Sequence, residues 1–269
     1  MKKNLLPLVF VPVAMLMLLL PSCTSEEEKM QLTKQEREAQ RREDSLALKI
    51  AVLPTEDSEP ILLADSLGLF EKMGVVVHLR KYGALSECRY ALKKKMVEGA
   101  VIDSVLGGVV AKDDATDLTY GRNTSLTLKL VTAKKSRILR QEQLADKIIA
   151  ADSRGASKLL AQRLKEELGK KRVFIVQCED VKVRYQMLTA GNVDGALLPE
   201  PYASMAVKKG ANVLKEYPDY KPGVIAFRSK AIADKRIRQQ YDRFIAAYDM
   251  ACDSIRVSKS RKASNRKSR

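Results

Sequence analysis

The chain alternates between short apolar runs and longer segments in which apolar residues recur every three or four positions. A short continuous apolar run suits a strand that is buried on both faces, whereas the longer period places apolar side chains on one face of a helix. Strands are predicted at 49–53, 75–80, 100–103, 126–132, 147–151, 173–177, 194–198 and 223–228. Helices are predicted at about 60–72, 85–98, 104–112, 156–168, 181–190 and 202–208. This alternation predicts βαβ units, and therefore an α/β fold with parallel sheets covered by helices.

The stretch GNVDGALLPEPYAS, residues 191–204, predicts a sharp corner between a strand and a helix. Its apolar run ends at Pro199, which cannot donate a hydrogen bond to a neighbouring strand. A second proline then opens the predicted helix that contains Tyr202. Open α/β sheets bind ligands at such corners, at the carboxyl ends of their parallel strands.

Two segments of the chain share one plan. MVEGAVIDSV (96–105) and LTAGNVDGALLPEP (188–201) each place a helix end and a glycine before a short apolar strand that runs into a loop. This repetition predicts two similar lobes, each with its own small sheet. We expect the chain to cross between the lobes over residues 126–133.

The N-terminus has the pattern of a secretory signal peptide. Lys2 and Lys3 precede an apolar stretch from Leu5 to Leu20, which at 16 residues is short for a membrane span. The sequence Leu-Pro-Ser-Cys that follows resembles a bacterial lipobox, so residues 1–22 are predicted to be removed and Cys23 to receive a lipid anchor. An ordinary soluble secretory protein and an uncleaved anchor remain alternatives.

Residues 23–48 are dominated by Glu, Lys, Arg and Gln, with too few apolar residues to form a core. This composition predicts a charged tether that holds the folded part away from the membrane. The acidic stretch 24–28 resembles the export signal of surface lipoproteins. The expected location is therefore the bacterial cell envelope, either at the periplasmic face of a membrane or on the outer-membrane surface.

The formal net charge is +16, but much of it lies at the ends of the chain. The last fourteen residues contain seven Lys or Arg and no acidic residue. We interpret 256–269 as a basic disordered tail, although binding of polyanions or acidic lipids is an alternative. The rest of the chain has no array of basic and aromatic residues, so no nucleic-acid partner is predicted.

The pattern resembles the substrate-binding proteins of ABC importers, specifically the family that binds thiamine precursors, alkanesulfonates, taurine or nitrate. The resemblance spans roughly residues 48–255 and rests on four segments, which are 49–77, 98–105, 153–157 and 191–204. It implies a periplasmic-binding-protein type II-like fold with a ligand cleft between two lobes. It further implies a small-molecule ligand and an ABC permease as partners. The lobes would comprise 49–130 with 222–255, and 131–221.

The resemblance also implies which loops bind the ligand. The candidate residues on these loops are Thr55, Glu56, Tyr82, Ser86, Asp103, Ser153, Arg154, Gly155, Ala156, Ser157, Glu200 and Tyr202. One of them has a physical argument of its own, because a helix that begins at Gly155-Ala156 presents unpaired N–H groups beside the Arg154 guanidinium. This arrangement predicts a small, anionic or zwitterionic solute. The alternative is that the serines only cap the helix and that Arg154 points to solvent.

No catalytic set is evident in the sequence. There is no nucleophile with a matched histidine, no phosphate-binding glycine loop and no metal-ligand spacing, so no enzyme activity, cofactor or metal is predicted. Two alternatives remain. The first is an enzyme built on the same fold, of the thiamine-precursor or menaquinone-pathway type. The second is a surface interaction lipoprotein without a transport role.

Overall fold

The computed structural model describes residues 33–39 and 44–267, in two units that comprise Met1–Leu46 and Ala47–Arg269. In the first unit, residues 33–39 and 44–46 are helical. The predicted signal peptide, the lipidation site Cys23 and much of the tether lie outside the described residues. No helix in the described part of the chain is long and apolar enough to cross a membrane.

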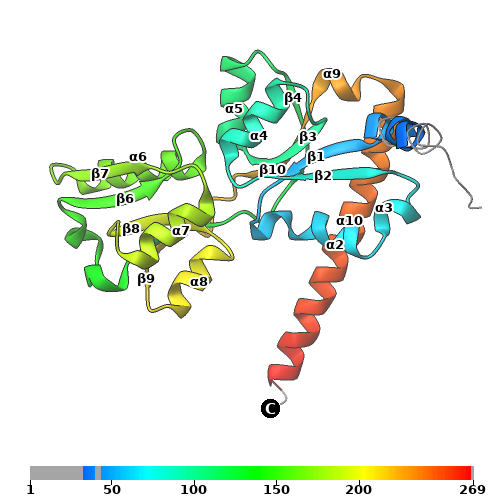
Figure 1. Ribbon diagram of the computed structural model, residues 1–269. Coiled ribbons are helices and arrows are strands. Elements are labelled where there is room, and N and C mark those ends of the chain that lie inside the picture. The colour runs from blue at the N-terminus through cyan, green and yellow to red at the C-terminus, as the bar shows by residue number, and fades with distance from the viewer. Residues whose placement is uncertain (1–32, 40–43, 268–269) are drawn as a thin grey trace, which may run out of the picture. The chain divides into compact units, whose positions relative to one another are not determined.

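Two five-stranded sheets organise the second unit (Figure 1). The first sheet has the order β2-β1-β3-β10-β4. Its strands are β1 (Leu48–Val52), β2 (Val77–Lys81), β3 (Gly99–Asp103), β4 (Leu118–Asn123) and β10 (Gly223–Arg228). β1 runs parallel to β2 and β3, whereas β10 runs antiparallel to β3 and β4.

Helices cover both faces of the first sheet. One face packs against α2 (Glu59–Ser66), α3 (Leu69–Lys72) and α10 (Lys235–Lys267), and the other against α4 (Leu85–Lys93) and α5 (Ser104–Asp113). Successive strand residues point to opposite faces, so that Ile50 packs on the α10 side and Ala51 on the α4 side. Two short elements, η1 (Glu56–Ser58) and α9 (Ser229–Ile232), complete this first lobe.

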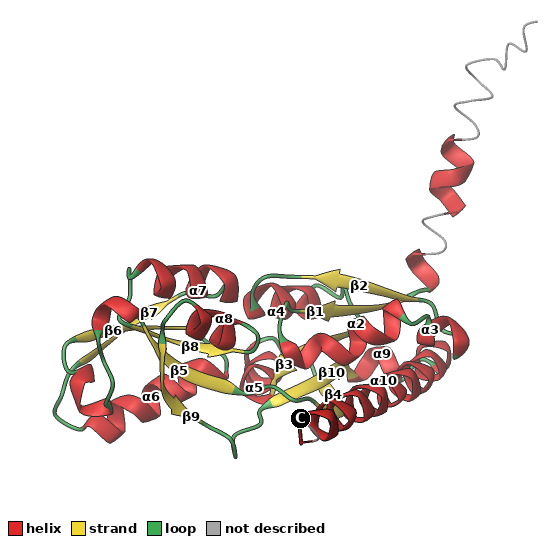
Figure 2. Ribbon diagram, turned by 90° about the horizontal axis from the view of Figure 1, so that it is seen from below, coloured by secondary structure: helices red, strands yellow, loops and turns green. Residues whose placement is uncertain are grey.

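The second sheet has the order β7-β6-β8-β5-β9. Its strands are β5 (Leu128–Thr132), β6 (Lys147–Ala151), β7 (Val173–Gln177), β8 (Gly195–Pro199) and β9 (Asn212–Glu216). Helix α6 (Ala156–Leu168) packs on one face, and α7 (Val181–Ala190) and α8 (Tyr202–Lys208) pack on the other (Figure 2). Two short turns, η2 (Lys134–Ser136) and η3 (Gln141–Leu144), follow β5.

The predicted α/β fold with two lobes is confirmed, but the sheets are mixed rather than parallel. β5 runs antiparallel to both of its neighbours, as β10 does in the first sheet. The sequence did not predict β4 and β9, which lie at the edges of their sheets. Their sequences, LTYGRN and NVLKE, contain no apolar run because an edge strand buries only part of its surface.

Two predicted boundaries differ in the structure. The helix predicted at 60–72 is broken into α2 and α3, because Gly68 adopts a left-handed conformation with φ of 62°. Residues 128–130, assigned to the first lobe, instead belong to β5 in the second sheet. The chain therefore crosses between the sheets over 124–127 and 217–222.

The C-terminal segment predicted to be disordered instead continues helix α10 as far as Lys267. No glycine or proline interrupts Lys235–Lys267, and most of its last turns consist of residues that tolerate or favour a helix. The beginning of the helix is fixed by tertiary packing, with Phe244 stacked on Phe70 at 5.4 Å between ring centroids. Farther along, Lys259 Nζ pairs with Glu56 Oε1 at 3.2 Å.

Candidate functional site

The carboxyl ends of strands from both sheets meet around an enclosed cavity of about 40 Å³. Thr55 follows β1 and Asp103 ends β3 in the first lobe, while Asp152 follows β6 and Glu179 follows β7 in the second. The cavity is lined by Leu53, Thr55, Asp57, Gly83, Leu85, Ile102, Asp103, Leu126, Leu128, Asp152, Ser157, Glu179, Val181, Arg184 and Pro199. This is the position at which α/β sheets bind their ligands.

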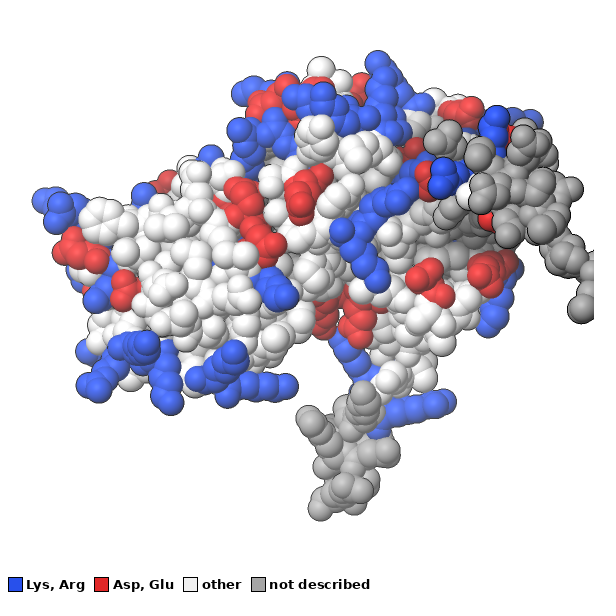
Figure 3. Space-filling view, viewed as in Figure 1, with Lys and Arg blue, Asp and Glu red and all other residues white. Residues whose placement is uncertain are grey.

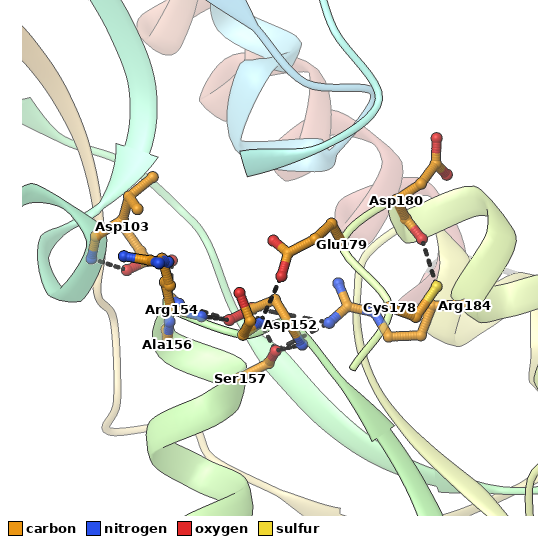
Figure 4. Close-up of polar contacts among 12 residues, drawn as sticks. Asp103, Asp152, Arg154, Ala156, Ser157, Cys178, Glu179, Asp180 and Arg184 are labelled. Atoms are coloured by element: carbon orange, nitrogen blue, oxygen red, sulfur yellow. Dashed lines mark hydrogen bonds and ion pairs between the residues drawn. The ribbon is translucent and has the colours of Figure 1, made fainter. Parts of the chain in front are cut away.

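The turn between β6 and α6 is organised by the Asp152 carboxylate (Figure 4). Its Oδ1 accepts hydrogen bonds from the backbone N–H groups of Gly155, at 2.5 Å, and Arg154, at 3.2 Å. Its Oδ2 accepts a hydrogen bond from the Ser157 hydroxyl, which in turn accepts one from Asp152 N at 2.8 Å. The first N–H groups of this turn are therefore already bound to a carboxylate of the protein.

Arg184 joins this network from helix α7. Its Nη1 donates to Ser157 Oγ at 2.9 Å and lies 3.7 Å from Asp152 Oδ2. The side chain is only 5 % exposed, and its Nε has no hydrogen-bond partner among the described residues. Beside it, Glu179 Oε1 accepts a hydrogen bond from Ser153 N at 2.8 Å. The second lobe thus presents two carboxylates and one guanidinium to the cavity.

Asp103 links the two lobes. Its Oδ1 accepts from Leu106 N at 2.8 Å, as the N-cap of α5, and its Oδ2 accepts from Ala156 N at 3.0 Å, at the start of α6 in the other lobe. The residue is 1 % exposed, and burial raises the pKa of its carboxyl to about 6. The N-terminus of α6, predicted to bind an anionic solute, therefore holds a carboxylate from the first lobe.

A cluster of buried polar atoms lies in and beside η1. Thr55 Oγ1, Asp57 Oδ1 and Ser58 Oγ all lack a hydrogen-bond partner within the described part of the chain. Asp57 is 3 % exposed, and its Oδ2 has only a long contact of 3.5 Å from Thr124 Oγ1. Burial raises the pKa of the Asp57 carboxyl. Unsatisfied groups of this kind are rare in protein interiors and often mark functional sites.

Backbone contacts close the lobes on either side of the cavity. Glu56 N donates to Glu200 O at 2.8 Å, and Val181 N donates to Gly83 O at 3.3 Å. The approach is also tight at Gly155, where a Cβ atom would lie 2.6 Å from Asp103 Oδ2 and 2.8 Å from Leu85 Cδ1. The structure therefore shows the lobes in a closed arrangement in which a Cβ atom at residue 155 would displace the side chains of Asp103 and Leu85.

The structure separates the predicted site residues into groups. Of the twelve, the enclosed cavity is lined by Thr55, Asp103 and Ser157. A separate, wider pocket of about 530 Å³ beside α5 and α6 is lined in part by Ser153, Arg154 and Gly155. Ala156 contributes its N–H group to Asp103. Those that line neither pocket are Glu56, Tyr82, Ser86, Glu200 and Tyr202.

Arg154, predicted to be the main contact for an anion, does not line the enclosed cavity. Its guanidinium is 48 % exposed and pairs with Asp113 of α5 at 3.4 Å. At the Pro-Glu-Pro corner, Glu200 pairs with Lys129 at 3.2 Å and accepts from Ser204 N at 3.0 Å, as a structural cap. Tyr202 is 8 % exposed and packs within the second lobe. At this corner, Pro199 alone lines the cavity.

The sequence reasoning missed four charged residues that line the cavity, which are Asp57, Asp152, Glu179 and Arg184. Asp103 was predicted through the resemblance, but its local pattern, a carboxylate at the end of an apolar strand, recurs in the acidic residues that follow β6 and β7 and could have identified them. Arg184 lies within the helix predicted at 181–190, where its local sequence does not distinguish it from a surface residue. Only the tertiary structure shows that it is buried against Asp152.

No family model matches the chain, and no curated protein matches it in sequence. Solved structures match it in fold. The periplasmic nitrate-binding protein NrtA from Synechocystis PCC 6803 aligns with a TM-score of 0.67 at 12 % identity, over 76 % of this chain and 60 % of that one. The ligand-binding component of an ABC-type import system from Staphylococcus aureus, solved with zinc bound, aligns with a TM-score of 0.64 at 17 % identity, over 76 % and 73 %.

The alkanesulfonate-binding protein SsuA from Xanthomonas axonopodis pv. citri, bound to MOPS, aligns with a TM-score of 0.63 at 17 % identity, over 79 % of this chain and 76 % of that one. The chain has the two-lobe fold of periplasmic binding proteins. The resemblance predicted from sequence is thus confirmed at the level of the fold. At these identities the shared fold does not identify the solute. The residues that line the cavity determine which solute chemistry it accepts.

No group of three or more His, Cys, Asp or Glu side chains that could hold a metal ion occurs in the described ranges. The carboxylates that line the cavity come from both lobes, Asp57 and Asp103 from the first and Asp152 and Glu179 from the second. Asp103, Asp152 and Glu179 accept hydrogen bonds from backbone N–H groups.

Proposed function

We propose that this protein is the solute-binding component of an ABC importer and that it closes its two lobes on a small solute in the enclosed cavity. The observation that supports this most strongly is the convergence of strand ends from two sheets on one buried space lined by charged side chains. The Staphylococcus aureus neighbour is itself the ligand-binding component of such an import system. The proposed protein partner is the permease of the importer.

Binding requires the lobes to open. The cavity of about 40 Å³ has room for roughly three water molecules, so a bound solute must be small and the lobes must part for it to enter. The sheets are joined by the crossings at 124–127 and 217–222, and few covalent links between lobes favour hinge motion. We therefore infer that the solute enters an open form and that the structure corresponds to the closed one.

A thermal-shift screen tests this function. Amines, sulfonates, nitrate, pyrimidines, carboxylates and amino acids are the probes, and each is offered over a wide concentration range. A solute at a hundred times its dissociation constant should stabilise the protein by about 2.7 kcal/mol, which corresponds to about 5–10 °C in Tm for a chain of this size. The solute that shifts Tm should also compact the protein in small-angle scattering.

The matched control for this screen is Gly155→Ala. The added methyl group would push against the side chains of Asp103 and Leu85 across the closed lobes, but it changes no charge. We expect this variant to lose the solute-induced shift and the compaction. If no probe shifts Tm, capture of a small solute is contradicted and the surface interaction protein becomes the better account. If a bound probe is converted to product, the protein is an enzyme.

We also propose that Cys23 carries the lipid that anchors the protein in the bacterial cell envelope. The support is the Leu-Pro-Ser-Cys sequence after a short apolar segment. In cells that process lipoproteins, the wild type should lose residues 1–22, gain the mass of a lipid and partition into detergent. Cys23→Ala should remain in the aqueous phase. Equal partitioning and equal mass, apart from the substitution, would contradict the anchor.

The predicted negative charge of the solute depended on free N–H groups at α6 and on Arg154. In the structure these N–H groups are bound to Asp103 and Asp152, and Arg154 is paired with Asp113. An anion would find its basic side chains, Arg154 and Lys158, in the wider pocket rather than in the enclosed cavity. The charge of the solute therefore depends on the residues that line the enclosed cavity.

A further inference from the structure

We propose that the solute is a small aliphatic amine, whose ammonium group binds between the carboxylates of the two lobes with Asp57 as its principal contact. This inference rests on the proposed function, because it concerns the solute of the same cavity. It differs from the negatively charged solute that the sequence predicts.

The charged residues that line the cavity are predominantly acidic. Asp57 and Asp103 come from the first lobe and Asp152 and Glu179 from the second, whereas Arg184 is the single basic residue of the lining. The N-terminus of α6 adds the equivalent of about half a positive charge, which leaves an excess of carboxylates. On the face in Figure 3, acidic side chains lie where the two lobes meet, with Lys and Arg side chains beside them.

The positive groups of the lining already make hydrogen bonds, although Arg184 Nε has no partner among the described residues. Arg184 is bound to Ser157 and lies 3.7 Å from Asp152. The N–H groups of Gly155 and Ala156 are bound to Asp152 and Asp103. A solute carboxylate or sulfonate would have to displace a carboxylate of the protein, and it would bring a further negative charge into a buried, acidic space.

Asp57 is the carboxylate that most lacks a partner. Its Oδ1 has none among the described residues, although the side chain is buried, and its Oδ2 has only the long contact of 3.5 Å from Thr124 Oγ1. A buried carboxylate with so few hydrogen bonds is costly, and a donor that carries positive charge satisfies it best. An ammonium group has three N–H donors, enough to bind Asp57, Thr55 and one carboxylate of the other lobe.

The rest of the lining explains why the cation would be organic. Six aliphatic side chains line the cavity, which are Leu53, Leu85, Ile102, Leu126, Leu128 and Val181. A metal ion requires a compact set of oxygen, nitrogen or sulfur ligands, and no such set occurs in the described ranges. An alkyl chain with one ammonium group matches this lining, because its carbons would contact the aliphatic residues and its ammonium group the carboxylates.

The cation also accounts for closure. Each lobe brings two carboxylates toward the other, so that closing the empty cleft opposes like charges in a medium of low dielectric constant. An ammonium group between the lobes turns this repulsion into attraction from both sides. The solute would thus stabilise the closed form over the open form, which is what capture requires.

The test is calorimetric titration of the full chain with four probes of equal length, which are n-propylamine, n-propanol, propionate and propanesulfonate, followed by putrescine and agmatine. We expect binding of the amines alone. If propionate or propanesulfonate binds and the amines do not, the inference is overturned while the proposed function stands. If none of these probes binds and the broader thermal-shift screen also finds no solute, the proposed function itself is contradicted.

Asp57→Asn identifies the contact. The substitution keeps the shape and removes the charge, and it should weaken amine binding about 10- to 150-fold, the loss expected for a charge-assisted hydrogen bond. The matched control is Asp113→Asn, which removes an exposed carboxylate at the wider pocket and should leave amine affinity unchanged. Equal affinities of wild type and Asp57→Asn for the amines would overturn the assignment of Asp57.

A second measurement needs no variant. The titratable groups that face Asp57 are Glu56, Cys88 and Tyr248, and those that face Asp103 are Asp152 and Tyr220. Burial raises the pKa of both aspartates, and a bound ammonium group would lower it again, so amine binding near pH 6 should release protons. Titrations in two buffers of different ionisation enthalpy measure this release. Net proton uptake would contradict a cationic solute.

Discussion

Replacing Arg184 with methionine should lower the free energy of unfolding by about 3–5 kcal/mol, because it leaves the buried Asp152 carboxylate without its cation. For a chain of this size the corresponding fall in Tm is about 6–20 °C. The contact lies entirely within the second lobe, between α7 and the turn before α6, so the loss should appear with or without a solute. Thermal and urea unfolding of the full chain measure it.

Arg154→Met is the matched control for this prediction. Arg154 lies in the same turn as the residues that Arg184 contacts, but its guanidinium is 48 % exposed and pairs with an exposed Asp113. Surface ion pairs of this kind contribute about 0–1 kcal/mol, so Tm should change little. If both variants lose similar stability, or if Arg184→Met unfolds like the wild type, the buried ion pair does not have the role assigned to it.

The stability of the protein should depend on pH through Asp103. In the folded chain burial raises the pKa of this carboxyl from 3.8 to about 6, so folding favours its protonated form. The resulting stability is fully present below about pH 4 and is lost as the pH rises through 6. Between pH 4 and pH 7 the contribution of Asp103 should fall by about 2–3 kcal/mol.

Comparison with Asp103→Asn isolates this effect. Asparagine does not titrate, and the loss of one acceptor for Ala156 N or Leu106 N is the same at every pH. Asp57, whose pKa is also raised by burial, is present in both proteins, so its contribution cancels in the difference. Urea unfolding at pH 4 and pH 7 should show a smaller decline for the variant. Parallel curves for the two proteins would contradict the burial of an ionisable carboxyl between the lobes.

Local sequence patterns were sufficient to predict much of the architecture. Apolar runs such as KIIAA (147–151) are long enough to identify buried strands, and the leucine stripe of α6 identifies an amphipathic helix. The edge strands β4 and β9 were missed because none of their side chains is fully buried, and neither strand has the pattern of a core strand. The antiparallel direction of β5 and β10 was missed because an apolar run of this length has no information about the direction of its neighbours.

The candidate site could be predicted only in part, because local sequence patterns locate loops but not the side chains that point into a cavity. A loop at the end of a strand can be located from sequence, and of the residues predicted on such loops Thr55, Asp103 and Ser157 line the cavity. It also placed Glu200 and Tyr202 there, although their side chains turn into local contacts of the second lobe. Which side chain of a loop reaches the cavity depends on how the following helix packs. This packing involves residues that are distant in the sequence, so a local pattern does not predict it.

The sequence by itself determined the alternation of strands and helices, the two lobes and the loops at which they meet, since each of these follows from the order of apolar, turn-forming and helix-forming residues. The tertiary structure alone decided the electrostatics of the cavity. Arg184 is buried because α7 packs beside the turn of Asp152, and the N–H groups of α6 are occupied because the first lobe brings Asp103 to them. Whether a charged group is paired or unpaired is decided only when segments distant in sequence meet. The acidic character of the cleft could therefore not be predicted from sequence.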